Sequence, residues 1–227
     1  MISKPNLDLL PLRPEWGRQT IDIILSAAGL IVLSPLLLLI AMCIACETGW
    51  PILFSQCRVG RGGKPFRLLK FRTMRVDNSG ACITVSGDSR ITPVGRFLRK
   101  FKLDEIPQLW NVVMAEMALV GPRPEVPEFV DLAQPIWRSV LQVRPGITDP
   151  ASIAFRQEER LLAKASDPVG FYRETLLPTK LAMNLAYIKE RTLWLDMKVI
   201  LRTVRCVSNA NKVCSQDTVV LSPGDSK

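Results

Sequence analysis

The sequence predicts an α+β fold that is mainly helical, with a small β-hairpin and one segment suited to a membrane. Three observations lead to this fold class. Residues 23–46 contain no charged side chain. Two short extended segments, 51–58 and 65–71, flank a glycine-rich turn and predict a hairpin. Most of the remaining chain has apolar residues at helical spacing.

The 227 residues carry a net charge of +9 and include no histidine. This length fits one large domain, or a small domain with appendages. The positive charge indicates a polyanionic partner: a nucleic acid, an anionic membrane surface or a phosphorylated substrate. The lack of histidine excludes Ser-His-Asp and Cys-His catalysis and disfavours a zinc hydrolase, so acid–base chemistry falls to Asp, Glu, Lys, Tyr or Cys. The six cysteines show no paired metal spacing and are expected to be free thiols.

The uncharged run is long enough to span a bilayer, and it begins too late and is too long for a signal peptide. Ser34-Pro35 at its centre favours a different geometry, because proline removes a backbone hydrogen bond and the serine hydroxyl can satisfy the freed carbonyl. Cations flank both ends of the run, so the positive-inside rule gives a spanning helix no clear orientation. The residues alone favour a kinked spanning helix, and a helix–break–helix that returns to the same face is the alternative.

An adjacent acidic pair, Asp104-Glu105, lies between a cluster of basic residues at 96–102 and a tight turn at 121–124. Pro107 is tolerated only in the first turn of a helix, so a helix over 106–117 is expected to begin near the pair. Helix N-termini favour phosphate oxygens. Neighbouring side chains on a helix point about 100° apart, so we expect two separate roles rather than a shared proton. A helix N-cap in a solvated charge run is the structural alternative.

Helices are expected in four further segments, over residues 93–102, 128–143, 152–165 and 170–190, and a loop over 76–92. The segment 187–207 predicts an amphipathic helix. We expect its apolar face to pack on the core, with an anionic membrane surface as the alternative. Residues 208–227 are polar without an apolar period and are expected to form a loose tail.

Six short motifs follow one another along the chain: Ser34-Pro35, Phe54-x-Gln56-x-Arg58-Val59-Gly60, KFRTM at 70–74, LDEIPQLWNV at 103–112, LVGPRPE at 119–125 and RPGIT at 144–148. In this order they resemble the bacterial sugar transferase family, the monotopic polyprenol-phosphate phosphoglycosyl transferases. The resemblance covers roughly residues 18–205. Each motif by itself is weak evidence for the family, whereas the six motifs in this order are very specific.

The resemblance implies that the apolar run is a re-entrant membrane helix–break–helix, with its break at Ser34 and Pro35. A hairpin and amphipathic interfacial helices would surround one cytoplasmic catalytic domain. The expected organisation is an N-terminal interfacial lead, a re-entrant membrane hairpin, a sugar transferase domain and a flexible tail, over residues 1–20, 21–48, 49–207 and 208–227. The protein would be monotopic in the bacterial inner membrane, in contact with membrane lipids, with both termini cytoplasmic.

The resemblance also implies a reaction. Family members transfer a sugar-1-phosphate from a UDP-sugar to undecaprenyl phosphate through a covalent aspartyl phosphosugar intermediate, and UMP leaves. They require Mg²⁺. The reaction would be the first membrane step in assembling a surface glycan or glycoconjugate, such as an exopolysaccharide or lipopolysaccharide. No nucleic acid partner is expected, and formation of a homodimer is left open.

Matching the motifs residue by residue makes Asp104 the nucleophile and Glu105 its partner, and both would bind Mg²⁺. Five basic residues would bind phosphate or nucleotide: Lys70, Arg72, Arg99, Arg123 and Arg144. Lys70 would also support the acidic pair. The residue types agree with this chemistry, because carboxylates are covalent nucleophiles at phosphorus and the guanidinium fork matches pairs of phosphate oxygens.

The chain departs from the common family pattern at Lys102, Glu116 and Ala118, and again after Thr148. These departures leave the identity of the sugar undetermined. Two other classes of protein remain to be weighed. A membrane-anchored nucleic-acid-binding module would use the positive charge, but no recognised binding motif is present. A membrane scaffold would use the apolar segments alone and would tolerate substitution across 99–123.

Overall fold

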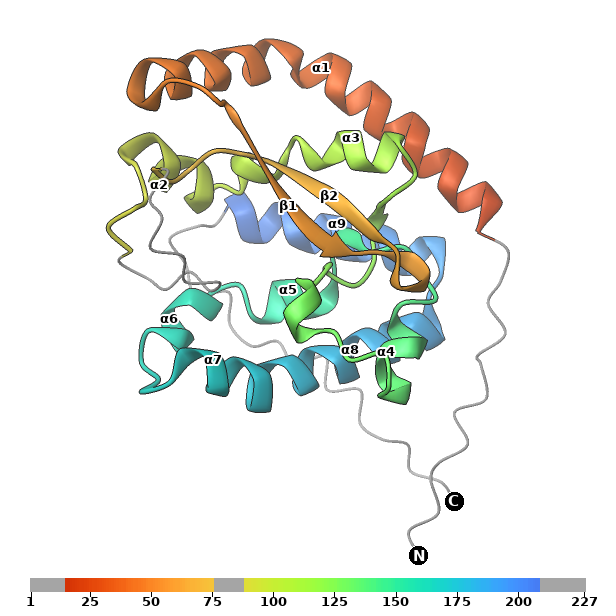
Figure 1. Cartoon of the computed structure of the whole chain (residues 1–227). Coiled ribbons are helices and arrows are strands. Elements are labelled where there is room, and N and C mark those ends of the chain that lie inside the picture. Colours follow the sequence, from red (N-terminus) through yellow and green to blue (C-terminus); the bar gives the residue numbers. More distant parts are fainter. Residues whose placement is uncertain (1–14, 76–87, 209–227) are drawn as a thin grey trace, which may run out of the picture.

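The computed structural model of the chain describes residues 15–75 and 88–208. A long N-terminal helix lies along one side, a β-hairpin lies next to it, and a group of shorter helices forms the far side (Figure 1). This arrangement confirms a mainly helical α+β fold. The predictions for the lead up to residue 14, the loop over 76–87 and the tail from 209 fall outside the described residues.

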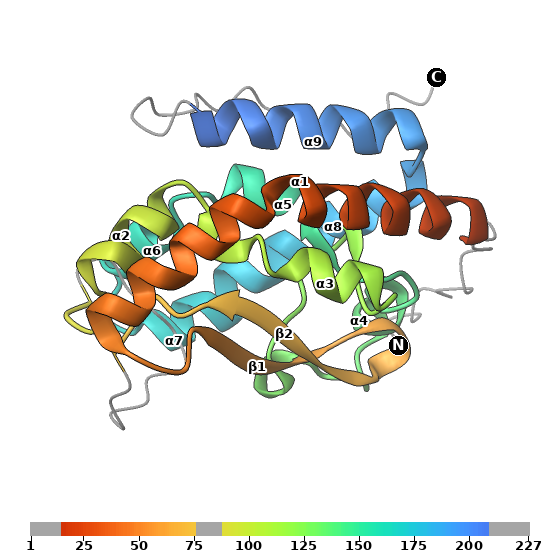
Figure 2. The same ribbon diagram turned by 90° about the horizontal axis from the view of Figure 1, so that it is seen from above.

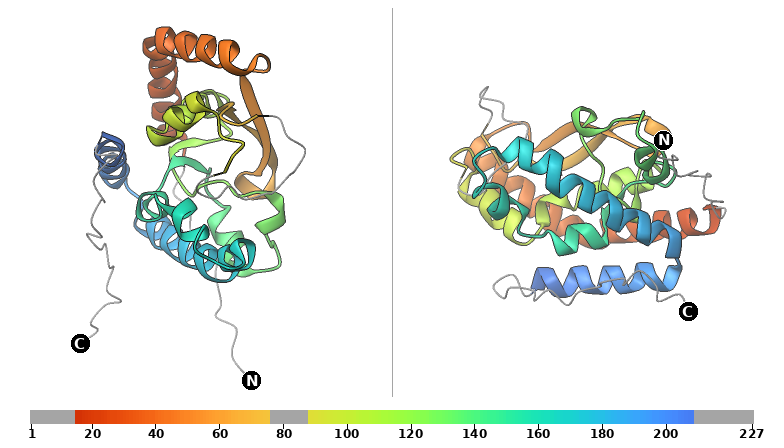
Figure 3. Two further views of the ribbon diagram at one scale, coloured as in Figure 1. Left: turned by 90° about the vertical axis from the view of Figure 1, so that its left-hand side faces the viewer. Right: turned by 90° about the horizontal axis from the view of Figure 1, so that it is seen from below.

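Helix α1 (Trp16–Thr48) contains the whole uncharged run and continues through Pro35. The predicted break is therefore corrected to a bend, because Pro35 removes only one backbone donor and the Ser34 hydroxyl donates to the Ile31 carbonyl at 2.8 Å. The two halves of α1 run in clearly different directions (Figure 3). Within the described residues, α1 is the one helix long and apolar enough to cross a membrane.

Strands β1 (Leu53–Val59) and β2 (Pro65–Phe71) form the predicted antiparallel hairpin. The turn between them, η1 (Arg61–Gly63), includes Gly62 at a φ of 68°, a left-handed conformation that glycine adopts without strain. Two side chains on the inner face of β2 are buried against α3 and the residues that follow it; this cluster consists of Phe66, Leu68, Val112 and Met117. The hairpin is thus fixed against the segment that follows the acidic pair.

A second sheet was not expected from the sequence. Strand β3 (Ala118–Val120) pairs in parallel with β4 (Gly146–Thr148). The backbones approach so closely beyond β3 that a Cβ atom on Gly146 would lie 2.1 Å from the Gly121 nitrogen. This pairing brings two of the sequence motifs, at 119–125 and 144–148, side by side.

The chain around the acidic pair forms three short elements: α2 (Pro93–Lys100), the 3₁₀ turn η2 (Leu103–Glu105) and α3 (Gln108–Val113). The predicted helix over 106–117 is shorter than expected. It ends before Ala115, which has a φ of 59°, because a left-handed residue stops a right-handed helix.

The predicted helix over 128–143 is much shorter than expected. That region contains only the 3₁₀ turn η3 (Pro127–Phe129) and the short helix α4 (Pro135–Val140). Pro135 is the physical reason, because the residue before a proline is disfavoured in the helical region. Gln134 accordingly has an extended backbone, with a ψ of 128°.

The remaining predicted helical regions are present with shifted ends, as α5 (Pro150–Ala154), α6 (Glu158–Leu162), α7 (Pro168–Phe171), the π-helical turn η4 (Tyr172–Leu176) and α8 (Leu177–Glu190). Together with α4 and β3 they enclose the main apolar core. Its buried members include Val120, Trp137, Leu177 and Tyr187.

Helix α9 (Leu193–Ser208) is amphipathic as predicted, but most of its apolar face does not pack on the core. Five side chains of that face are exposed: Leu193, Trp194, Met197, Leu201 and Val204. Figure 2 shows α9 at one edge of the molecule, roughly parallel to the first half of α1. Val199 of α9 is buried in the main core, and Leu195 and Ile200 pack against that core. The expected core packing is therefore confirmed for this side of the helix and corrected for the five exposed side chains. Asp196 also pairs with Arg18 of α1 at 3.0 Å.

Candidate active site

The acidic pair occupies η2, between the end of α2 and the start of α3. Lys102, just before it, has a φ of 56° and a ψ of 21°, and this left-handed residue reverses the chain after α2. Asp104 and Glu105 are only 6% and 7% exposed. Leu103 packs against the apolar cluster that the C-terminal half of α1 forms with β2 and α2. The pair therefore lies next to the second half of the membrane-suited helix.

Glu105 is paired with three cations. Arg123 Nη2 donates to its Oε1 at 2.6 Å, Lys70 Nζ donates at 3.2 Å, and Lys102 Nζ lies 3.8 Å from the same oxygen. Burial by itself would raise the pKa of Glu105, but the three positive charges together hold that pKa well below its usual range. Glu105 is therefore ionised and anchors the cations around the pair.

Asp104 has different surroundings, because its buried Oδ1 has no hydrogen-bond partner among the described residues. Burial raises the pKa of Asp104, and the adjacent charge of Glu105 raises it further, while Lys70, Lys102 and Arg99 oppose the rise. Folded proteins leave few buried polar atoms unpaired. The Oδ1 of Asp104 is thus the atom of the pair whose hydrogen-bonding capacity is unused.

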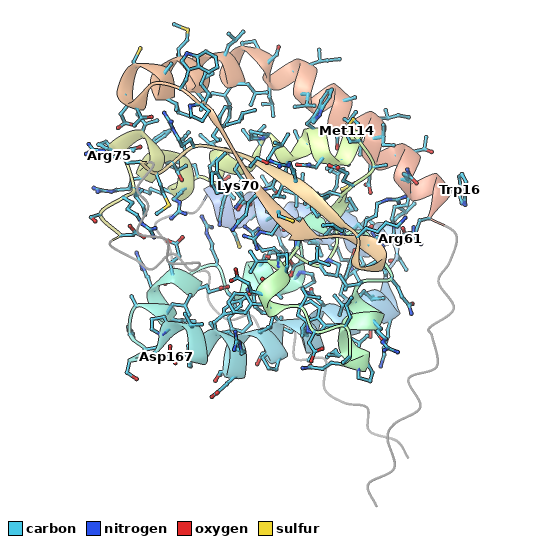
Figure 4. The ribbon with its side chains drawn as sticks, in the orientation of Figure 1. Trp16, Arg61, Lys70, Arg75, Met114 and Asp167 are labelled. Carbon is cyan, nitrogen blue, oxygen red and sulfur yellow. The ribbon has the colours of Figure 1, made fainter. Side chains whose placement is uncertain are left out.

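Lys70 lies near the end of β2 (Figure 4), and its Nζ donates to Glu105 Oε1 at 3.2 Å. The strand is held against α3 by Asn111, whose side chain accepts from the Leu69 N–H at 3.1 Å and donates to the Arg67 carbonyl at 2.8 Å. Burial lowers the pKa of Lys70 to about 8, against the opposing charge of Glu105. The hairpin therefore contributes a cation whose charge is sensitive to pH near neutrality.

Arg123 comes from the turn that follows β3, where prolines at 122 and 124 restrict the backbone on both sides. Its guanidinium contacts both oxygens of Glu105, through Nη2 to Oε1 at 2.6 Å and Nη1 to Oε2 at 3.5 Å. The charge of Glu105 raises the pKa of Arg123, so the guanidinium remains charged. The result is a fixed positive group directly beside the acidic pair.

Arg99 lies at the edge of the site, on the last turn of α2. Its Nε donates to Thr73 Oγ1 at 3.2 Å, and its Nη1 pairs with the exposed Glu159 at 3.2 Å. Such an exposed ion pair stabilises a protein by little, so replacing Glu159 by another anion at Arg99 would cost little stability. Its charge already lowers the pKa of Asp104.

Two of the predicted phosphate ligands contact α1 and not the pair. Arg72 donates to Thr48 Oγ1 at 2.5 Å, at the C-terminal end of α1. Arg144 pairs with Glu15 at 3.3 Å and donates to Gln19 Oε1 at 2.7 Å, at the N-terminal end of α1. Among the described contacts, neither arginine reaches the two acids. The structure thus brings Lys70, Arg99 and Arg123 to the site and places Arg72 and Arg144 at the ends of α1.

Sequence reasoning missed two charged residues. Glu15 pairs with Arg61 at 3.0 Å, with Arg144, and with Arg191 at 2.7 Å. No local pattern signals this cluster, because its members come from widely separated parts of the chain. Lys102 was seen as one of several flanking cations, and its position two residues before Asp104 was the signal that could have singled it out.

The expected Mg²⁺ ligands are Asp104 and Glu105. Within the described ranges, no group of three or more acidic or cysteine side chains converges on one point. Mg²⁺ ordinarily takes one or two carboxylates and completes its octahedron with water and substrate phosphate. The unpartnered Oδ1 of Asp104 suits such a site, whereas Glu105 already carries three cations. The residues fit a metal held mainly by Asp104 and by substrate oxygens.

Residues 14–210 match the family described as Bacterial sugar transferase. The chain belongs to this family. A similar member, the UDP-glucose:undecaprenyl-phosphate glucose-1-phosphate transferase of Caulobacter vibrioides, is 36% identical over 214 residues, which cover 88% of this chain and 76% of the relative.

Two other bacterial sugar transferases are longer. The Escherichia coli protein of the same name is 35% identical over 189 residues, 81% of this chain and 38% of the relative. The UDP-N-acetylgalactosamine-undecaprenyl-phosphate N-acetylgalactosaminephosphotransferase of Aeromonas hydrophila is 35% identical over 195 residues, 84% of this chain and 43% of the relative. The chain thus spans about three quarters of the Caulobacter relative and less than half of these two.

Proposed function

We propose that this bacterial sugar transferase moves a sugar-1-phosphate from a UDP-sugar to undecaprenyl phosphate and releases UMP. The names of the relatives support both substrate classes: two name UDP-glucose, one names UDP-N-acetylgalactosamine, and all three name undecaprenyl phosphate. Because the relatives differ in their sugar, we assign the donor only as a UDP-sugar. The lipid-linked product would begin the assembly of a surface glycan or glycoconjugate.

The observation that carries the proposal is the contrast between the two acids. Asp104 is buried with a free oxygen, and the adjacent Glu105 is buried with three cations around it. A carboxylate with a free oxygen suits a nucleophile. Fixed cations beside it suit the negative charge that a transferred phosphoryl group spreads over its oxygens.

In the first step an oxygen of Asp104 attacks the sugar-bearing phosphorus of the donor. The bond from that phosphorus to the bridging oxygen breaks, and UMP leaves with the oxygen and the bonding electrons. In the second step a phosphate oxygen of undecaprenyl phosphate attacks the same phosphorus. The acyl phosphate bond then breaks and restores the Asp104 carboxylate. Both attacking groups are anions, so neither step demands a proton transfer, which suits a chain without histidine.

The cations have distinct tasks in this scheme. Glu105 holds Lys70 and Arg123 beside the phosphorus, and Arg99 at the rim binds a donor phosphate in exchange for Glu159. Mg²⁺ bound at Asp104, with Glu105 as the neighbouring carboxylate, would neutralise charge on the diphosphate. EDTA should then abolish UMP release and added Mg²⁺ should restore it, and full activity in EDTA would contradict the metal requirement.

For the membrane, we propose that α1 enters and leaves the bilayer through the cytoplasmic face. The two ends of α1 are tied to the same catalytic body: Arg18 pairs with Asp196 near one end, and Thr48 accepts from Arg72 at the other. A helix that crossed the bilayer would place its ends on opposite sides of the membrane. The bend near Pro35 and these two attachments together support a re-entrant helix.

Exposed aromatic side chains at the ends of α1 and on α3 and α9 support contact of these helices with lipid. Trp16 and Trp50 flank α1 and are each 81% exposed, and Figure 4 shows Trp16 pointing away from the body. Trp110 on α3 and Trp194 on α9 are exposed as well. Tryptophan is enriched at membrane interfaces, and the basic residues of α9 would gain from anionic lipid. The exposed apolar face of α9 would lie among the headgroups.

The covalent step is tested by incubating the protein with UDP-glucose or UDP-N-acetylgalactosamine without acceptor. Mass spectrometry should show a sugar-phosphate adduct on Asp104, and adding undecaprenyl phosphate should remove it. Asp104→Asn should give neither adduct nor UMP, because an amide does not attack phosphorus. The exposed Glu190→Gln is the matched control and should retain the adduct. Wild-type UMP release by Asp104→Asn would exclude this nucleophile.

The orientation of α1 is tested with single cysteines placed at exposed positions before and after its uncharged run in the sequence, in a protein whose native cysteines are replaced. Gly17→Cys and Lys64→Cys are suitable, because a side chain at residue 17 meets no heavy atom within 4 Å and Lys64 is exposed. In sealed inverted vesicles, a membrane-impermeant maleimide should label both positions. Labelling of one position alone would mean that α1 spans the membrane.

A further inference from the structure

We propose that Lys102 is an additional phosphate-binding residue of this active site, and that it contacts a substrate phosphate directly. This inference rests on the proposed function, because it assigns one more residue to the same transfer reaction. Four observations carry it: the backbone conformation of Lys102, its long contact with Glu105, its exposure, and the charge balance of the site.

The backbone of Lys102 is unusual for a side chain of its size. Its φ of 56° places it in the left-handed region, which glycine adopts freely and other residues adopt with strain. The position follows the end of α2, where a left-handed residue commonly closes a helix and is most often glycine. A lysine here therefore retains a side chain at a position that would be more stable without one. Strain of this kind is concentrated at functional sites.

The contact with Glu105 does not account for that side chain. Lys102 Nζ lies 3.8 Å from Glu105 Oε1, beyond hydrogen-bond distance, and its side chain is 45% exposed. Arg123 and Lys70 approach the same oxygen at 2.6 and 3.2 Å, and their side chains are less exposed, at 28% and 20%. Glu105 is thus satisfied by the two closer cations. An exposed ion pair at the longer distance contributes little to stability.

The charge balance indicates what Lys102 binds. The charge of Arg99 is balanced by Glu159. Three further cations, Lys70, Lys102 and Arg123, surround two carboxylates, Asp104 and Glu105. One positive charge is therefore in excess before any substrate arrives, and Lys102 is the cation with the most exposed side chain. Its ammonium group lies 3.8 Å from Glu105 Oε1 on a side chain that is 45% exposed, so it is accessible to solvent and close to the buried pair. The donor diphosphate and the acceptor lipid phosphate both supply the anion that this group would recognise.

The test uses two substitutions that keep the backbone and remove the charge. Lys102→Gly relieves the strain, and Lys102→Asn places a small polar residue that tolerates the left-handed region. The control is Lys100→Asn, which removes the same charge from a side chain that lies over the Phe101 ring at 5.5 Å. The full-length protein is assayed in nanodiscs of phosphatidylglycerol and phosphatidylethanolamine, with UDP-glucose or UDP-N-acetylgalactosamine, whichever turns over.

We expect both Lys102 variants to raise the KM for one substrate about tenfold while kcat changes less than about threefold, as for the loss of one charge-assisted contact made in the ground state. Lys102→Gly should also raise the melting temperature by about 2–4 °C, whereas Lys100→Asn should leave KM within about twofold of wild type. Opposite effects on stability and on substrate binding separate a binding role from a structural one.

Two arms of the assay identify the source of the phosphate. If the KM for the UDP-sugar rises and adduct formation with donor alone slows, Lys102 binds the donor diphosphate. If only the KM for undecaprenyl phosphate rises, it binds the lipid phosphate. Unchanged KM values in both arms, or a fall in kcat alone, would overturn the proposal. An Asp104→Asn enzyme that remains active would instead contradict the proposed function, so the two failures are distinguishable.

Discussion

At the scale of single residues, the site depends on the different surroundings of two adjacent acids. Glu105 is saturated by cations, and Asp104 keeps a buried oxygen without a partner. Adjacency in the sequence made both acids candidates, and it did not say which would be which. The family resemblance made Asp104 the expected nucleophile, and in the structure the positions of Arg123 and Lys70 give the two acids different surroundings. Under the proposed function, the paired acid would organise the cations and the unpaired acid would attack phosphorus.

The anchoring role of Glu105 predicts the effect of removing its charge. Glu105→Gln leaves Lys70 and Arg123 without a carboxylate partner, so both cations lose their fixed positions beside the phosphorus. We expect kcat for UMP release to fall by about 10²–10³. The slow step should be adduct formation, measured in a single turnover with donor alone. Adduct formation at the wild-type rate would show that Glu105 does not organise the cations.

The pKa of Lys70 predicts a pH dependence. Burial lowers this pKa to about 8, so Lys70 is charged below that pH and becomes neutral as the pH rises through it. Activity that needs the charge should therefore fall on the alkaline side of about pH 8. Lys70→Arg should move this decline to higher pH, because a guanidinium stays protonated. The measurement is the pH profile of kcat/KM. If its decline at alkaline pH does not shift in Lys70→Arg, the decline arises from another group.

At the scale of elements, close backbone contacts place the segments that carry the charges. Helix α2 packs so tightly on the end of β2 that a Cβ atom on Gly95 would lie 2.1 Å from the Thr73 carbonyl oxygen. This contact sets the position of Arg99, which bonds to the Thr73 side chain. The glycine is therefore needed for space.

Gly95→Ala should consequently destabilise the protein by about 2–4 kcal/mol, because backbone on both sides must move. Gly17→Ala is the matched control: it lies in α1, meets no heavy atom within 4 Å, and should be neutral or slightly stabilising. Thermal unfolding in detergent measures the stability of both variants. Equal melting temperatures for the two variants would mean that α2 is not held by this contact.

At the scale of the whole molecule, the two ends of α1 are joined to one body by polar contacts. Three guanidinium groups, from Arg61, Arg144 and Arg191, converge on Glu15 at the N-terminal end. Arg144, expected to bind nucleotide, takes part in this cluster. The attachment sets the direction in which α1 leaves the body and so affects how the active site meets the membrane.

Removing the charge of Glu15 leaves the three arginines without a common partner. Glu15→Gln should destabilise the folded protein by about 2–4 kcal/mol, and hydrogen exchange should increase in the first turns of α1. The exposed Glu190→Gln is the control and should change neither. If the first turns of α1 exchange at the wild-type rate in Glu15→Gln, the cluster does not hold the helix.

Much of this protein is determined by local sequence. The uncharged run, the glycine turn of the hairpin, and the acidic pair among cations are each encoded by neighbouring residues, because hydrophobic burial, turn conformation and charge density act over short stretches. The helices near 128–143 and 106–117 were predicted too long, since one proline and one left-handed alanine decide their ends.

Contacts between distant segments were decided by the tertiary structure alone. Lys70 and Arg123 lie 35 and 18 positions from Glu105 along the chain, and only the packing of the hairpin and the parallel strands brings them to one carboxylate. The same packing leaves the apolar face of α9 exposed and directs Arg72 and Arg144 to the ends of α1. The sequence specifies which side chains carry charge. The distances between them in the folded protein determine which of those charges are in contact.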